Sequence, residues 1–161
     1  LATGWNPGEL SELGISQAKE LGDLVADKQF DIVFCSDLTR AIGSAHFAFE
    51  GMYEIEEDSR LRECNYGDWN GKPGKEFKDM KAHVDVPFEN GESYQDVERR
   101  IDEFLWFLKK KYDGKHIAIV AHQAPQLALD VLIKNKTWEE AIDEDWRKTK
   151  SWQPGWEYII E

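Results

Sequence analysis

Residues 32–45 read Ile-Val-Phe-Cys-Ser-Asp-Leu-Thr-Arg-Ala-Ile-Gly-Ser-Ala, and this stretch decides the fold class. Its first four residues include no charged or strongly polar position, which predicts a strand buried on both faces, as parallel strands usually are. Ser36 and Asp37 then favour the start of a helix that runs to about Phe49. A strand that passes directly into a helix is the unit from which α/β domains are built.

The same pattern returns later in the chain. Residues 117–121 read Ile-Ala-Ile-Val-Ala, and after His122 a helix is expected to about Ile133. Further patterns predict helices over residues 11–27, 75–83, 93–111 and 138–143, and short strands over 53–55 and 156–160. Because short apolar strands alternate with helices, the sequence predicts an α/β fold with a mostly parallel sheet.

The composition excludes several classes of protein. The chain has 161 residues, enough for one hydrophobic core, and we expect residues 1–161 to form a single domain. Its net charge of −12 argues against nucleic acid or an anionic membrane as the main partner. No apolar run approaches the roughly 20 residues of a spanning helix, and no signal peptide is recognisable. Cys35 and Cys64 lack metal-ligand spacing, and Cys35 lies in an apolar run, where a free cysteine is usually a small buried side chain. A reducing compartment is the simplest interpretation, so we expect a cytoplasmic protein.

Polar residues follow both apolar strands, at the point where each strand ends. Arg40 falls in the first turn of the helix after the first strand, and His122 directly follows the second. Ligands of open α/β sheets bind beyond the carboxyl ends of the strands, and a helix N-terminus with a nearby arginine binds anions. The residues alone therefore predict that Arg40 and His122 meet at one anion pocket.

Several segments, in this order along the chain, resemble signatures of the histidine phosphatase (phosphoglycerate mutase-like) superfamily. They are Leu10-Ser11 through Gly14 to Gln17-Ala18, Ser36–Ala41 with Ser44-Ala45, Leu61-Arg62-Glu63 with Tyr66–Gly71, and Val120-Ala121-His122. The resemblance covers nearly the whole chain. It implies a three-layer α/β/α fold like that of phosphoglycerate mutase.

The resemblance also implies a two-step phosphoryl transfer. In the family, a nucleophilic histidine takes the phosphoryl group as a phosphohistidine, and charged groups around the phosphate stabilise the transition state. Carried over to this chain, Arg40 is a phosphate clamp and His122 is the second histidine of the pocket. Glu63 is the general acid that protonates the leaving oxygen and then activates water.

Substrate contacts and partners follow from the same resemblance. Thr3 and Gly4 resemble a loop that touches the non-reacting end of the substrate, and the backbone N–H of Gln123 adds a phosphate contact. The expected partner is a small phosphorylated metabolite, with no nucleic acid and no membrane. No metal and no cofactor are implied, and the oligomeric state stays open.

One family signature does not occur in these 161 residues. It is the Arg-His-Gly that ends the family's first central strand and carries the nucleophile; none of His46, His83, His116 and His122 follows an arginine. The resemblance therefore implies a nucleophile and a central strand upstream of Leu1. We expect the chain by itself to be N-terminally incomplete, to fold poorly and to be inactive. Three explanations remain open: a shortened form of an active enzyme, a degenerate domain that binds without turnover, or a motif supplied by a separate segment.

The sequence thus predicts an enzyme of the histidine acid phosphatase type in its full-length form, which hydrolyses phosphomonoesters without a metal. One alternative is a phosphoglycerate mutase, to which Thr3-Gly4-Trp5 and Asn65-Tyr66-Gly67 are somewhat similar. The chain lacks the long insertion of the glycolytic mutases, which favours the phosphatase. The other alternative is a non-catalytic domain that binds a phosphorylated ligand.

Overall fold

The structure, a computed structural model, describes residues 2–74, 79–149 and 155–161 and alternates strands with helices. Its helices are α1 (Glu12–Leu24), α2 (Thr39–Phe49), α3 (Tyr94–Lys111), α4 (Gln123–Lys134) and α5 (Trp138–Asp143). Its strands are β1 (Ile32–Cys35), β2 (Ile55–Glu57) and β3 (Ile117–Val120). Short 3-10 turns are η1 (Ser59–Leu61), η2 (Gly67–Trp69), η3 (Met80–His83) and η4 (Trp146–Thr149).

The sheet is parallel throughout the part of the chain that the structure describes. Its order is β2-β1-β3, and Phe34 of β1 is paired with Glu56 on one side and Ile119 on the other. Each strand enters from the same end because a helical connection returns the chain across the sheet. The prediction of an α/β fold with a parallel sheet is confirmed.

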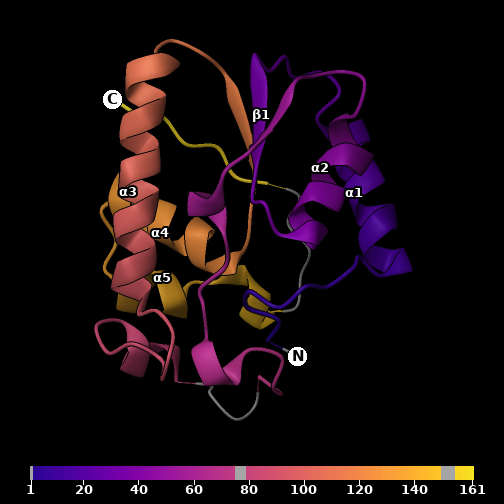
Figure 1. The fold of residues 1–161 in the computed structure, drawn as a ribbon. Helices are drawn as coiled ribbons and strands as arrows, with labels where there is room; N and C mark the ends of the chain where they lie inside the picture. Colours follow the sequence, from indigo (N-terminus) through magenta and orange to yellow (C-terminus); the bar gives the residue numbers. More distant parts are fainter. Residues whose placement is uncertain (1, 75–78, 150–154) are drawn as a thin grey trace.

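Helices cover both faces of this sheet (Figure 1). Helices α1 and α2 lie on one side of β1, and α3 and α4 lie on the other. Alternate residues of β1 divide between the layers, since Ile32 and Phe34 join the large core cluster with α3 and α4, whereas Val33 packs with Ala48 and Phe49 of α2. All four residues of β1 are buried, as a strand covered on both faces must be.

Strand β3 differs from the expectation of a second fully buried strand. Its residues Ile117–Val120 are all apolar, yet each is only partly buried. Among the described residues, β3 pairs with β1 alone, so its other edge is open. An edge strand has a neighbour on one side only, which leaves its apolar side chains partly accessible.

The closing strand predicted over 156–160 is wrong, because residues 155–161 have no regular secondary structure. Their side chains contact α4 instead: the Tyr158 hydroxyl donates a 2.7 Å hydrogen bond to Asp130. Of the helix predicted over 75–83, residues 75–78 lie outside the described ranges, and Met80–His83 form a 3-10 turn. The helix predicted over 138–143 is confirmed at both ends.

Helix α3 begins and packs as its capping box and apolar stripe predict. Ser93 accepts a hydrogen bond from the backbone of Asp96, whose carboxylate accepts one in return from the backbone of Ser93. This capping box fixes the start of the helix. Its apolar residues Val97, Ile101 and Phe104 are buried in the large core cluster that also contains Phe34 of β1. In the described part of the chain, no helix is both long and apolar enough to cross a membrane.

Candidate active site

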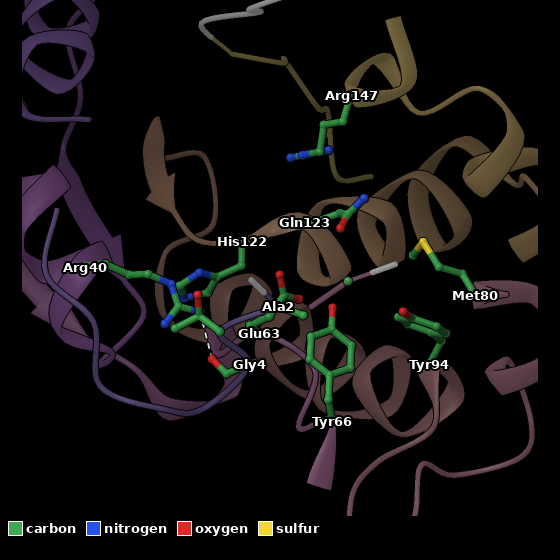
Figure 2. Close-up of a pocket in the computed structure, with 12 residues that line it drawn as sticks. Ala2, Gly4, Arg40, Glu63, Tyr66, Met80, Tyr94, His122, Gln123 and Arg147 are labelled. Atoms are coloured by element: carbon green, nitrogen blue, oxygen red, sulfur yellow. Dashed lines mark hydrogen bonds between the residues drawn. The ribbon is translucent and has the colours of Figure 1, made fainter. Parts of the chain in front are cut away.

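A cavity of about 530 Å³ lies beyond the carboxyl ends of β1 and β3 (Figure 2). A cavity of this size holds a small metabolite rather than a single phosphate ion. It is lined by Ala2, Thr3, Gly4, Arg40, Glu63, Tyr66, Gly74, Met80, Tyr94, His122, Gln123 and Arg147. The lining thus contains every residue to which the sequence assigned a catalytic or substrate contact, drawn from four separate stretches of the chain.

Arg40 enters the cavity from the first turn of α2. Its Nη2 donates a 2.8 Å hydrogen bond to the carbonyl of Gly4, and its Nη1 lies 3.4 Å from the carbonyl of Asn6. These partners are neutral, and no carboxylate in the described part of the chain forms an ion pair with Arg40. Burial lowers the pKa of its guanidinium. A half-buried cation held only by carbonyls is well suited to receive an anion.

His122 lies at the junction of β3 and α4, and its ring faces Arg40 (Figure 2). Its Nε2 atom is buried and has no hydrogen-bond partner among the described residues. Burial, together with the positive charges of Arg40 and Arg100, lowers the pKa of His122 to about 3. The ring is therefore neutral at physiological pH, and its buried nitrogen is available to a ligand.

Glu63 is buried, with 9% of its surface exposed. Its Oε1 accepts hydrogen bonds from the backbone N–H groups of Cys64 and Ala124, at 2.9 and 3.0 Å. Burial raises the pKa of this carboxyl, and the two hydrogen bonds oppose the rise only in part. Oε2 accepts no hydrogen bond from the described residues. The side chain therefore offers one oxygen that can carry a proton into the cavity.

The segment around Glu63 is held by one arginine, Arg100, whose side chain is mostly buried. Arg100 of α3 donates hydrogen bonds of 2.6, 2.7 and 3.0 Å to the carbonyls of Arg60, Arg62 and Glu63. The same guanidinium forms a bidentate ion pair with Glu92, at 2.9 and 3.0 Å. The guanidinium therefore supplies donors to three carbonyls at the end of η1 and in the segment that follows it.

The loop that carries Thr3 and Gly4 is hydrogen-bonded to the segment around Glu63. Trp5 donates its indole N–H to the carbonyl of Glu63 at 2.7 Å, and its ring lies under the guanidinium of Arg62. Asn70 accepts from the backbone N–H of Trp5, and a Cβ on Gly4 would lie 1.8 Å from the Asn70 amide oxygen. Gly4 has φ of +53°, so this close approach needs glycine. The loop is thereby held against the cavity.

Gln123 is the first residue of α4. Its backbone N–H points from a helix N-terminus and has no partner in the described ranges, as an anion-binding position requires. Its side-chain amide donates to Asp145. Among the described residues, no cluster of three or more His, Cys, Asp and Glu side chains is placed to hold a metal ion.

Sequence reasoning gave no site role to some of the lining residues. The segment Tyr66–Gly71 resembles a family signature that gives Tyr66 no role, and no pattern in the sequence marks Tyr94, Met80 or Arg147 as part of a site. Arg147 belongs to η4, more than twenty positions after His122. No local pattern marks it, because its place in the lining depends on how the chain after α5 packs on α4.

Comparison with known proteins shows the family of this chain. A family model described as the histidine phosphatase superfamily (branch 1) matches residues 1–151. The adenosylcobalamin/alpha-ribazole phosphatase of Salmonella typhimurium is 33% identical over 135 residues, which are 76% of this chain and 66% of that protein. A 2,3-bisphosphoglycerate-dependent phosphoglycerate mutase of Methylorubrum populi is 30% identical over 154 residues, 85% of this chain and 73% of the mutase. This chain thus spans about two thirds of the Salmonella phosphatase.

Solved structures share the overall fold of this chain. YhfR of Bacillus stearothermophilus superposes with a TM-score of 0.77 at 27% identity, covering 86% of this chain and 74% of YhfR. A mycobacterial glucosyl-3-phosphoglycerate phosphatase in complex with VO3 superposes with a TM-score of 0.75, also at 27% identity, over 86% of this chain and 77% of that one.

Proposed function

Since this chain belongs to the histidine phosphatase superfamily (branch 1), we propose that it hydrolyses small phosphomonoesters through a phosphohistidine, without a metal. The observation that carries the proposal is the meeting of Arg40, Glu63 and His122 at one cavity. They supply an unpaired cation, a buried acid and a free imidazole nitrogen, which are the groups that phosphoryl transfer to and from a histidine requires. We also propose a cytoplasmic location, favoured by the free thiols Cys35 and Cys64.

In this proposal the nucleophilic histidine lies outside residues 1–161, on the Arg-His-Gly segment that the family resemblance implies. The open edge of β3 supports this placement. The carboxyl ends of parallel strands lie at one edge of a sheet, so a further parallel strand beside β3 would end next to His122. That is where a nucleophile must stand to reach a phosphate held by Arg40.

In the first step, the nucleophilic nitrogen attacks phosphorus and the bond from phosphorus to the leaving oxygen breaks. Arg40, the Nε2–H of His122 and the backbone N–H of Gln123 bind the non-bridging oxygens and stabilise their charge. Glu63 gives its proton to the leaving oxygen, which departs as an alcohol. In the second step, water attacks phosphorus, Glu63 takes a proton from that water, and the phosphorus–nitrogen bond breaks to release phosphate and free histidine.

The pKa shifts suit these roles. Because burial raises the pKa of Glu63, the proton needed in the first step persists toward neutral pH. Because the pKa of His122 is lowered to about 3, its ring is neutral before substrate arrives and binds as a hydrogen-bond donor. A bound phosphate dianion would then raise the pKa of His122 by charge attraction.

A phosphoglycerate mutase is the second candidate, because a mutase is 30% identical to this chain over 85% of its length. The two functions use the same phosphohistidine and differ in the acceptor, which is water in one and a sugar acid in the other. A mutase retains the phosphoryl group on the enzyme until the acceptor is bound, whereas a phosphatase releases it to water.

The test uses the full-length gene product. Phosphate release from p-nitrophenyl phosphate is measured with and without EDTA and vanadate, and an acid-labile, base-stable phosphoenzyme is sought after quenching. Turnover that resists EDTA and is blocked by vanadate supports the phosphatase. Isomerisation of 3-phosphoglycerate that depends on 2,3-bisphosphoglycerate and outpaces hydrolysis would replace it by the mutase.

A non-catalytic domain would give a third result. Vanadate or phosphate would raise the melting temperature of the full-length protein, but neither a phosphoenzyme nor turnover would be found. That combination would overturn the proposed hydrolysis while leaving the anion pocket in place.

A further inference from the structure

The cavity is lined by a second cation besides Arg40. Arg147 lines the cavity, and Figure 2 shows it above Gln123 and apart from Arg40. Its side chain is 29% exposed, which is partly buried for an arginine. The residues proposed above to bind the transferred phosphate do not include Arg147. A cavity lined by two separate cations has a place for more than the transferred phosphate.

The guanidinium of Arg147 is fixed along one edge only. Its Nη1 donates to Oδ1 of Asp145 at 2.9 Å and to Oε1 of Gln126 at 3.0 Å, and its plane lies over the ring of Trp146. Nη2 and Nε donate no hydrogen bond to the described part of the chain. An arginine that is held at one nitrogen and stacked on an indole is pre-organised, and its remaining donors are available to an oxyanion.

One buried carboxylate aligns this arginine with its neighbour. Only 3% of the Asp145 side chain is exposed. Its Oδ1 accepts from Arg147 and its Oδ2 accepts from the side-chain amide of Gln123. The amide nitrogen of Gln123 therefore lies on the Arg147 side, and its amide oxygen points back into the cavity (Figure 2). That oxygen is placed to accept a hydrogen bond from a substrate hydroxyl.

Given the phosphoryl-transfer function proposed above, on which this assignment rests, we infer that Arg147 binds a second oxyanion, carried by the leaving group of the substrate. Asp145 is a positioning residue that orients Arg147 and Gln123. The preferred substrate is thus a phosphomonoester whose alcohol part bears a carboxylate or a second phosphate, with a hydroxyl between. Tyr66, Tyr94 and Met80 form the opposite, less polar wall and limit the bulk of that group.

The test measures binding, so that it does not depend on turnover. In the full-length protein carrying Glu63→Gln to slow hydrolysis, the dissociation constants of 3-phosphoglycerate and glycerol 3-phosphate are measured by calorimetry. 3-Phosphoglycerate carries a carboxylate at the position where glycerol 3-phosphate carries a hydroxymethyl group. We expect 3-phosphoglycerate to bind about tenfold more tightly or better, as a charge-assisted hydrogen-bond pair to arginine provides. Fructose 1,6-bisphosphate against fructose 6-phosphate tests a second phosphate in the same way.

The variant Arg147→Gln should bring the ratio of the two dissociation constants close to one and leave vanadate affinity within about twofold. Because Arg147→Gln leaves the buried Asp145 carboxylate unpaired, the double variant Asp145→Asn/Arg147→Gln provides a second form that is less prone to unfold. Arg147→Lys should restore part of the preference. Arg99→Gln is the matched control, since Arg99 is 68% exposed on α3 and does not line the cavity.

Equal binding of the acidic and neutral esters by the parent, or a preference that survives Arg147→Gln, would overturn the assignment to Arg147. Either result would leave the proposed phosphatase standing, because vanadate and both esters would still bind. Failure of the parent to bind vanadate and both esters would instead overturn the proposed function, and the assignment with it.

Discussion

The Glu63 side-chain oxygen Oε1 accepts a 3.0 Å hydrogen bond from the backbone N–H of Ala124, 61 positions further along the chain. Ala124 lies in the first turn of α4, which begins directly after His122. The proposed acid and the proposed phosphate site are therefore fixed to the same helix end. This bond occupies Oε1 of Glu63, while Oε2 accepts no hydrogen bond from the described residues.

Glu63→Gln should lower kcat/KM for an alkyl phosphate by about 10²- to 10⁴-fold, because kcat/KM reports the first step, in which the leaving alkoxide then lacks a proton donor. The loss of kcat/KM should be much smaller for p-nitrophenyl phosphate, whose leaving group departs without a proton. In the parent, kcat/KM for the alkyl ester should fall as pH rises through the raised pKa of Glu63, since only the protonated form donates. Steady-state kinetics of both esters check this, and equal losses would argue against an acid role.

Arg40→Ala should weaken vanadate binding by at least about tenfold and lower turnover in parallel, because the phosphate loses its charged clamp. The carbonyls of Gly4 and Asn6 would also lose their donor. Arg40→Lys should recover only part of the affinity, since an ammonium does not make the bidentate contact. Vanadate titration measures the effect, and unchanged affinity in Arg40→Ala would contradict the site.

The lowered pKa of His122 has a consequence for stability. The unfolded chain binds a proton at the ordinary pKa of 6.5, while the folded ring does so only near pH 3. Between these values the unfolded state holds more protons, so this histidine lowers stability as pH falls, by up to about 1.4 kcal/mol per pH unit. The raised pKa of Glu63 acts in the opposite sense above its ordinary value.

Comparison with His122→Gln isolates the contribution of the histidine. The free energy of unfolding of the parent, minus that of the variant, should decrease as pH falls from about 6.5 toward 3. Urea denaturation of the full-length protein in phosphate-free buffer at several pH values measures it. A difference that stays constant over this range would show that the ring titrates normally in the folded state.

Arg100→Met should destabilise the fold by about 3 kcal/mol or more, because it removes one partner of a largely buried ion pair and takes the Arg100 donor from three carbonyls, of which only that of Glu63 keeps another donor, the indole of Trp5. Only 14% of the Arg100 side chain and 19% of the Glu92 side chain are exposed. Arg99→Met, one position earlier and 68% exposed, should change stability by no more than about 0.5 kcal/mol. Urea denaturation of both variants provides the comparison, and similar losses would argue against the anchoring role.

Comparing Gly67→Ala with Gly51→Ala separates the cost of a positive φ from the cost of a steric clash between the new Cβ and its neighbours. Both glycines have positive φ, of +56° and +78°. A Cβ on Gly67 would lie 2.0 Å from the carbonyl oxygen of Glu89, whereas one on Gly51 would meet nothing within 4 Å. Gly51→Ala should therefore cost about 1 kcal/mol, and Gly67→Ala clearly more. Equal melting temperatures for the two variants would show that the backbone around Glu89 moves away from the added methyl group at little cost.

The sequence predicted most of the fold because its decisive patterns are local. The apolar run of β1 and the capping box of Ser93 specify a strand and a helix start within a few residues. Strand β3 has an equally apolar sequence, but its partial burial depends on what lies at its second edge. The segment 156–160 has strand-forming residues and still forms no ladder, because Tyr158 binds α4 instead.

The site was predicted unevenly for the same reason. Arg40 and His122 follow from the rule that strand ends face the ligand, whereas Glu63 came only from the family resemblance. Its acidic neighbours at 56–58 are typical of a solvated loop, and the anchoring by Arg100 from α3 that accompanies its burial has no signal in the sequence. Arg147 and Asp145 depend on the packing of η4 against α4, which no motif records.

The open edge of β3 also bears on how the 161 residues would behave in a test tube. Peptide groups that have no ladder partner among the described residues, flanked by partly accessible isoleucine and valine, are a template for pairing with a second molecule. Samples in which nothing covers this edge should associate with increasing concentration and seed misassembly during refolding. A short synthetic peptide that pairs with β3 as a further parallel strand should suppress this association, which would be measured as turbidity. Covering the edge would therefore keep the polypeptide monodisperse.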